Sequence, residues 1–151
     1  MSLIRRALPN EADALSQIAL SAKAHWGYPE RWMEIWKPQL IFEPDYFTEN
    51  ESWVIEAEGI PIGFYTLQVR DEIAWLENLW VLPDYIGKGV GRRMFLHAVD
   101  LASQRGYKVL QLEVEPNAIG FYEKMGMIKI GEHQYELDGE PRILPLMEMI
   151  L

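Results

Sequence analysis

Three glycines at alternate positions, Gly87, Gly89 and Gly91, form the segment with the most direct chemical meaning. They follow an apolar run that ends at Pro83, and a helical pattern follows them. Glycines leave backbone N–H groups uncovered and let the chain turn without a Cβ penalty. At the start of a helix, such N–H groups and the helix dipole bind anions. The segment therefore predicts a site for a phosphorylated ligand.

The spacing G-x-G-x-G narrows the choice of ligand. A Walker A loop needs G-x-x-x-x-G-K-[ST], and a dinucleotide fingerprint needs a third glycine where Arg92 stands. A glycine-rich turn that simply enters a helix is the alternative, because short glycine patterns recur by chance. The basic residues Lys88, Arg92 and Arg93 in an acidic protein favour the anion site.

A second segment, residues 116–127 (PNAIGFYEKMGM), carries a tyrosine at helical spacing. Ala118, Tyr122 and Met125 stand at i, i+4 and i+7, so they share one face of a helix. A lone tyrosine on such a face is most often packed in the core with a satisfied hydroxyl. The alternative is a phenol held for proton transfer.

Periodicity predicts an α/β protein with a mixed sheet (α+β), in the order β-α-α-β-β-β-α-β-α-β-β. Strands are expected at 3–8, 52–57, 60–69, 72–82, 108–115, 127–137 and 142–151; helices between 10 and 27, at 29–38, 88–105 and 116–125; and a loop at 41–50. The crossover helix at 88–105 should make its two flanking strands parallel neighbours.

Composition limits the partners. The chain has 151 residues, which fits one domain spanning 1–151. Its net charge of −9 argues against nucleic acid and anionic membrane surfaces and favours a cationic acceptor such as an amine. No apolar run reaches membrane-spanning length and no signal peptide is visible, so a cytoplasmic location is expected. The absence of cysteine excludes thiolate chemistry, and isolated histidines predict no metal.

The two segments together resemble the GNAT superfamily of acyl-CoA-dependent N-acetyltransferases. Residues 81–83 (VLP) and 86–91 (IGKGVG) resemble the family's V-x-P and [Q/R]-x-x-G-x-[G/A] elements. Residues 116–127 resemble its P-N-A-x-x-F-Y-E-K-x-G-F element, and the order of elements also resembles that fold. Ile86 departs from the usual Gln or Arg, and Met127 replaces the usual Phe.

The resemblance implies acetyl-CoA as co-substrate and assigns roles to particular residues. The backbone of Leu79, Trp80 and Val81 would bond the pantetheine arm, and the N–H groups of Gly87, Lys88, Gly89, Val90, Gly91 and Arg92 would hold the pyrophosphate. Asn117 would contact the arm and Phe121 would flank it. Tyr122 would protonate the departing thiolate, which is feasible because the pKa values of a thiol (~8.5) and a phenol (~10) lie close together.

A general base is also needed. An amine with a pKa of about 10.4 is almost entirely protonated at neutral pH, so a carboxylate or a water chain must remove its proton. Glu77 and Glu113 interrupt apolar strands that should flank the cleft. Strand alternation puts Glu113 on the face opposite Leu112. Solvated strand faces explain both residues equally well; as base, Glu77 is slightly favoured over Glu113.

The acceptor is expected at the segment joining the first two helices. His25, Trp26 and Tyr28 stand at a helix end, where loops carry function, whereas Trp32 and Trp36 fit packing better. The acceptor would be a small-molecule or peptide amine. The two late strands could support a homodimer.

Three functions compete. The first is acetyl transfer to a primary amine by direct attack, since no cysteine offers the thiol that a covalent route would most readily use. The second is a non-catalytic acyl-CoA-binding sensor or regulatory module, which Ile86 favours and Tyr122 disfavours. The third is a nucleotide-binding oxidoreductase domain, which the missing third glycine and the single crossover helix disfavour.

Overall fold

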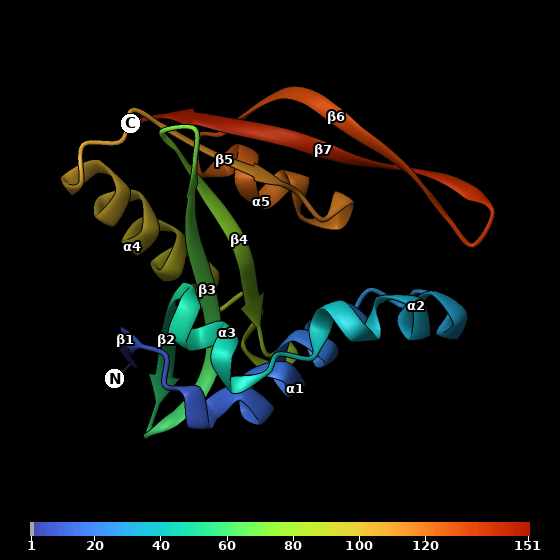
Figure 1. Ribbon diagram of the computed structural model, residues 1–151, viewed down its shortest axis with the longest axis horizontal. Coiled ribbons are helices and arrows are strands. Elements are labelled where there is room, and N and C mark those ends of the chain that lie inside the picture. The colour runs from blue at the N-terminus through green and yellow to red at the C-terminus, as the bar shows by residue number, and fades with distance from the viewer. Residues whose placement is uncertain (1) are drawn as a thin grey trace.

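The strands join into one seven-stranded sheet with the order β1-β2-β3-β4-β5-β7-β6 (Figure 1). The computed structural model describes residues 2–151. The strands are β1 (Ser2–Arg6), β2 (Glu51–Ala57), β3 (Ile60–Arg70), β4 (Ile73–Val81), β5 (Val109–Glu113), β6 (Ile128–Leu137) and β7 (Glu140–Ile150). All neighbours are antiparallel except β4 and β5, which are parallel as the crossover predicts.

Helices cover both faces of the sheet. They are α1 (Ala12–Ala24), α2 (Glu30–Leu40), α3 (Pro44–Glu49), α4 (Val90–Gln104) and α5 (Ile119–Lys124). In α4 the buried side chains Val90, Met94, Ala98 and Ala102 recur every four residues and form one apolar face. This face packs on the sheet, and the opposite face meets solvent.

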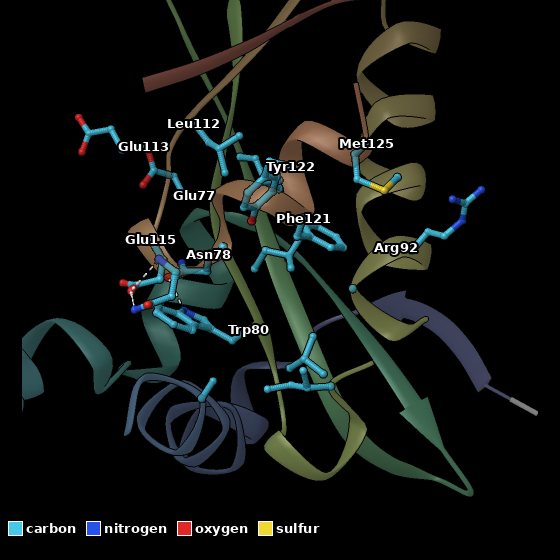
Figure 2. Close-up of a pocket in the computed structure, with 18 of the residues that line it drawn as sticks. Glu77, Asn78, Trp80, Arg92, Leu112, Glu113, Glu115, Phe121, Tyr122 and Met125 are labelled. Carbon is cyan, nitrogen blue, oxygen red and sulfur yellow. Dashed lines mark hydrogen bonds between the residues drawn. The ribbon is translucent and has the colours of Figure 1, made fainter. Parts of the chain in front are cut away.

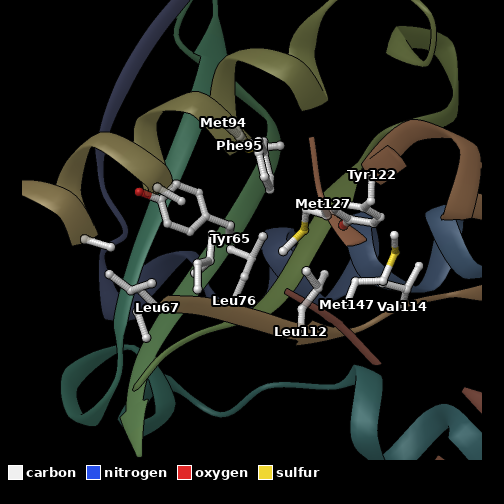
Figure 3. Close-up of a cluster of buried hydrophobic side chains, with 14 of the residues drawn as sticks. Tyr65, Leu67, Leu76, Met94, Phe95, Leu112, Val114, Tyr122, Met127 and Met147 are labelled. Atoms are coloured by element: carbon white, nitrogen blue, oxygen red, sulfur yellow. The ribbon is translucent and has the colours of Figure 1, made fainter. Parts of the chain in front are cut away.

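The core has two parts, one on each face of the sheet. On one face, α4 and α5 pack on the central strands around Phe95, Leu110 and Met147 (Figure 3). On the other face, α1, α2 and α3 pack on β2 and β3 around Leu15 and Phe64. The sheet is thus the middle layer of a three-layer α/β fold. The glycine turn follows the end of β4, and residues 116–127 follow the end of β5.

Two local expectations were wrong. Residues 41–50 were expected to form a loop, but α3 forms there because Pro44 suits the first helical turn and Phe47 is 3% exposed against Phe42 and Phe64. Pro38 was expected to close the second helix, but α2 continues to Leu40, which is buried. The order is therefore β-α-α-α-β-β-β-α-β-α-β-β.

The sheet splits between β4 and β5. The two strands pair only at Ala74–Leu110 and Trp75–Gln111. Beyond this point β4 pairs with β3 only, as far as Val81 opposite Gly63, and β5 pairs with β7 only. The separation leaves the backbone edges of β4 and β5 facing each other across a gap in the sheet.

A bulge in β4 sets which side chains meet that gap. Tyr65 pairs with Leu79 and Leu67 pairs with Leu76, so Glu77 and Asn78 together lie opposite one residue of β3. A bulge of this kind reverses the alternation of side chains along the strand. Leu76 and Leu79 therefore both pack against the α4 face.

The β6–β7 hairpin reaches from the sheet toward α2 (Figure 1). Leu137 near its tip is 4% exposed within the core of the α1–α3 face, and Asp138 forms an ion pair with Arg31 of α2. The guanidinium carbon of Arg142 lies 5.1 Å from the ring centre of Trp32 and 5.3 Å from that of Trp36. The hairpin thus fixes the first two helices beside the split.

Candidate active site

The split in the sheet is the floor of a cavity of about 840 Å³ (Figure 2). Its walls come from β4, β5, the glycine turn, α5 and the end of α1. Arg92 lies at one end of the close-up, and the carboxylates of Glu77, Glu113 and Glu115 lie toward the other. The cavity therefore joins a cationic end to an acidic end.

The glycine turn forms the cationic end. Gly87 and Gly89 both have φ of 82°, in the left-handed region where side chains are strained. Open space surrounds the position of a Cβ at both residues, and both line the cavity. Gly89 caps α4 without a side-chain hydrogen bond, so the N–H groups of the first turn lack intrahelical partners. This arrangement fits a pyrophosphate.

The open edge of β4 fits an extended arm that carries amide groups. Leu79, Trp80 and Val81 pair with β3 on one side, and all three line the cavity. The other edge of β4 has no strand partner at these residues, because β4 and β5 pair only as far as Trp75 and Gln111. An extended ligand can therefore add to this edge as a strand would, which is what a pantetheine arm requires.

Aromatic packing supports the opposite wall. The ring centre of Phe121 lies 5.0 Å from that of Tyr122 and 6.5 Å from that of Phe95, in edge-to-face arrangements. An ideal Cβ on Gly91 would lie 3.5 Å from the Phe121 ring. A side chain longer than alanine at Gly91 would therefore meet Phe121 and narrow the cavity.

Tyr122 lies in the middle of the cavity wall (Figure 2). It is 5% exposed, and within residues 2–151 its hydroxyl makes no hydrogen bond. Burial raises its pKa above the usual value for a phenol. The hydroxyl therefore stays protonated at neutral pH and is available as a donor, as a general acid requires.

Glu77 and Glu113 both line the acidic end of the cavity. Glu77 pairs with Arg70, and its side chain is 33% exposed. Glu113 is 44% exposed, and its Oε1 lies 4.0 Å from His133 Nδ1. As alternation predicts, Leu112 is buried on the other face of β5. Glu113 is thus the less constrained of the two carboxylates.

A third carboxylate, Glu115, is held by its neighbours. Lys23 Nζ donates to Oε2 at 2.7 Å, Asn117 Nδ2 donates to Oε1 at 2.7 Å, and the Tyr28 hydroxyl also donates to Oε1. Burial alone would raise the pKa of Glu115, but these hydrogen bonds and Lys23 outweigh it and the pKa is lowered. Burial and the bond to Glu115 raise the pKa of Tyr28 to about 12.

The structure brings most of the predicted residues to one cavity. Those that line it are Trp26, Glu77, Leu79, Trp80, Val81, Gly87, Gly89, Gly91, Arg92, Glu113, Asn117, Phe121 and Tyr122. The other side chains lie beside it: Val90 is buried under the turn, Lys88 lies over Tyr85, His25 packs on Trp26, and Tyr28 bonds Glu115.

Sequence reasoning missed several residues of the acidic end, including Arg70, Trp75, Asn78 and Glu115. Asn78 donates to the Tyr46 hydroxyl and accepts from Trp80 Nε1, so it braces the bulge. Glu115 had a visible signal, because a carboxylate followed by Pro116 often caps a helical turn. Its side chain indeed accepts from the Asn117 backbone N–H, although that contact is long at 3.5 Å.

Comparison with known proteins decides the family. The model of the acetyltransferase (GNAT) family matches residues 15–127. The chain belongs to this family. The match includes the glycine turn, both splayed strands and Tyr122, which are the parts that form the cavity.

The relatives of this GNAT chain include named acetyltransferases. It is 31% identical over 107 residues to peptidyl-lysine N-acetyltransferase YjaB of Salmonella typhimurium, covering 70% of this chain and 68% of the relative. It is 30% identical over 88 residues to the uncharacterized N-acetyltransferase MJ1207 of Methanocaldococcus jannaschii, where it covers 52% of this chain and only 39% of the relative.

Solved structures share the fold over the whole chain. A GCN5-related N-acetyltransferase from Rhodopseudomonas palustris superimposes with a TM-score of 0.84 at 23% identity, covering 100% of this chain and 96% of that one. The PaiA N-acetyltransferase of Thermoplasma acidophilum, solved in complex with coenzyme A, gives a TM-score of 0.76 at 23% identity, covering 100% and 99%.

These findings support an acyltransferase. The family uses acetyl-CoA, and the cavity walls fit that molecule. Among residues 2–151, no group of three or more histidine, aspartate or glutamate side chains could hold a metal ion. None of the helices described is long and apolar enough to cross a membrane.

Proposed function

We propose that this chain transfers an acetyl group from acetyl-CoA to a primary amine by direct attack. The observation that carries the proposal is the position of Tyr122. Its unpartnered hydroxyl lies on a wall of the split, between the glycine turn and the carboxylates of Glu77 and Glu113. The thioester of an arm lying along β4 would be placed within this gap.

The reaction balances with the groups present. Glu77 or Glu113 accepts a proton from the ammonium, directly or through water, and the neutral nitrogen attacks the thioester carbonyl carbon. The attack forms the C–N bond of a tetrahedral intermediate, which collapses as the C–S bond breaks. Tyr122 donates its proton to the departing thiolate, and the second proton of the nitrogen passes through water to the Tyr122 phenolate, so that a neutral amide and the CoA thiol remain. General acid and base steps of this kind each contribute about 10²–10⁴ in rate.

The acidic end of the cavity supports a cationic acceptor. Glu77 is paired there with Arg70 and Glu115 with Lys23, whereas Glu113 forms no ion pair with a lysine or an arginine among residues 2–151, and the whole chain carries a net charge of −9. Trp26, just after α1, adds an apolar surface to the lining of the cavity. A lysine side chain of a peptide, as the name of the relative YjaB indicates for that protein, or a small alkylamine would have the right chemistry.

The direct test is release of free thiol from acetyl-CoA in the presence of a panel of amines and lysine peptides. We expect release to depend on the amine and to fall when Tyr122 is changed to Phe. Thermal shift with CoA, acetyl-CoA and NAD gives a separate readout, since a ligand at about 100 times its Kd stabilises by roughly 2.7 kcal/mol. No shift with either CoA species would refute the proposal.

The single domain over residues 1–151, the cytoplasmic location and the homodimer through the late strands stay predictions. So do the substrate contacts of His25, Trp26 and Tyr28. Trp26 alone of these three lines the cavity. Sedimentation of the purified chain would test the homodimer, and alanine substitution at the three residues would test the substrate contacts.

A further inference from the structure

Glu115 lies where the acceptor side and the cofactor side of the cavity meet. Lys23 comes from α1, and Tyr28 comes from the segment between α1 and α2. Asn117 comes from the 3-10 turn after β5, η3 (Pro116–Ala118). The side chains of Lys23 and Glu115 are 11% and 13% exposed. One partly buried carboxylate thus links the predicted acceptor segment to a residue predicted to contact the acyl-CoA arm.

The hydrogen bonds fix the orientation of the Asn117 carboxamide. Its Nδ2 lies 2.7 Å from Glu115 Oε1 and 3.0 Å from the Tyr28 hydroxyl. A carboxylate can only accept, so the amino end of the carboxamide must face Glu115. Both Nδ2 hydrogens are then used, and Oδ1 is the one polar atom of this side chain left for a ligand. Asn117 can therefore offer the cavity an acceptor but no donor.

Glu115 itself is poorly suited to be the base. Its two oxygens already accept from Lys23, Tyr28 and Asn117. Hydrogen bonds to a carboxylate favour its charged form, so a carboxylate in such a network takes up a proton less readily than one exposed to water. Its contribution must therefore act through the groups that it holds.

We propose that Glu115 is a positioning residue, which locks the Asn117 carbonyl toward an N–H donor of the acyl-CoA arm and couples that contact to the acceptor segment through Tyr28 and Lys23. The inference rests on the proposed function. It predicts that Glu115 affects the affinity for acyl-CoA only by holding Asn117 in place. It also predicts that the KM for the acceptor depends on Glu115. Couplings of this kind typically change affinity by about 5–150-fold.

The test is a double-mutant cycle on the Kd of acetyl-CoA, measured by calorimetry without acceptor. We expect Glu115→Gln and Asn117→Ala each to raise Kd about tenfold, and the double variant to bind no more weakly than Asn117→Ala alone. Additive effects, or a Kd for Glu115→Gln within about twofold of the unmodified chain, would overturn the inference.

Steady-state kinetics supply the second readout. We expect Glu115→Gln and Tyr28→Phe to raise the KM of the acceptor while kcat stays within about threefold, because Tyr122 is untouched. Loss of kcat with an unchanged KM would count against coupling and would indicate a catalytic role for Glu115.

Matched variants separate positioning from damage to the fold. Glu11 is 14% exposed and ion-paired with Arg5 outside the cavity, so Glu11→Gln removes a similarly buried carboxylate and should leave the Kd of acetyl-CoA unchanged. If Glu115→Gln does not fold, Tyr28→Phe removes one of the two acceptors of Asn117 and should still raise Kd about threefold. If the unmodified chain binds neither CoA nor acetyl-CoA, the proposed function and this inference both fail.

Discussion

Trp75 of β4 lies opposite Gln111 of β5, and this is the last position at which the two parallel strands pair. The next residues, Leu76 and Leu112, already line the cavity. If the two strands stayed paired as far as Leu79, the gap would close and the free backbone edge at Leu79 would be covered. The cavity thus depends on where the pairing of β4 with β5 stops as much as on which residues surround it.

Changing Tyr122 to Phe should lower kcat by about 10²–10⁴ while acetyl-CoA still binds. The substitution removes the hydroxyl but keeps the ring that packs on Phe121 and Phe95. Thiol release measures kcat, and calorimetry measures binding. Since burial raises the pKa of Tyr122, its ionisation should not limit the rate of the unmodified enzyme up to pH 9. Unchanged turnover in Tyr122→Phe would remove this residue as the acid.

Glu77→Gln and Glu113→Gln should identify the base. The residue that accepts the proton should lose about 10²-fold or more in kcat/KM on substitution, and the acidic limb of its pH profile should flatten. The other substitution should change kcat/KM by only a few-fold. Arg70→Gln is the matched control for Glu77, because it removes the ion pair but keeps the carboxylate. If kcat/KM falls by less than tenfold in both glutamine variants, a water chain that does not involve these residues removes the proton.

Gly89→Ala should weaken binding of CoA and lower stability together. At a φ of 82°, alanine costs about 1–2 kcal/mol, and the backbone will relax away from the conformation that aims its N–H groups. Isothermal titration and a urea melt measure both effects. Gly120 lies inside α5, with open space around its Cβ position, and does not line the cavity. Gly120→Ala should therefore leave CoA affinity unchanged.

Local patterns in the sequence predicted much of the fold and of the cofactor side. Glycine spacing located the turn at Gly87 and Gly89, and alternation in β5 separated Leu112 from Glu113. The residues of the acidic end are brought together by long-range contacts and by a bulge, which leave no pattern in the neighbouring sequence. The contact of Lys23 with Glu115 joins residues 92 positions apart, and the bulge at Glu77 moves the pattern of β4 by one residue.

The same reasoning explains the errors at Pro38 and Pro44. From the neighbouring residues alone, proline predicts a helix stop at position 38 and a loop around position 44. In the structure, burial of Leu40 extends α2 past Pro38, and burial of Phe47 stabilises a helix that starts at Pro44. Tertiary packing overrides a local breaker when the next apolar residue reaches the core.

His97 should make folding stability depend on pH. Burial lowers its pKa below the usual value of 6.5, and the Tyr65 hydroxyl lies 2.6 Å from its Nδ1. The unfolded chain therefore takes up a proton at a higher pH than the folded chain. Stability should fall as pH drops through about 6.5 toward the folded pKa, and level off below it. The urea midpoint of His97→Gln should fall less between pH 7 and 5. An equal fall would show that carboxylates dominate this range.

Ile86→Arg should strengthen binding of CoA by up to about fivefold at low salt. Ile86 is 42% exposed at the rim of the cavity, next to Gly87, where an added cation would face the pyrophosphate site. An exposed charge pair contributes roughly 0.2–1 kcal/mol, and salt screens it. The gain should therefore shrink as ionic strength rises from about 20 mM to 0.5 M. Ile86→Gln is the neutral control, and it should give a smaller gain that does not respond to salt. If Ile86→Arg binds no more tightly than Ile86→Gln at low salt, backbone N–H groups and Arg92 already satisfy the phosphates, and the apolar residue costs this enzyme nothing in affinity.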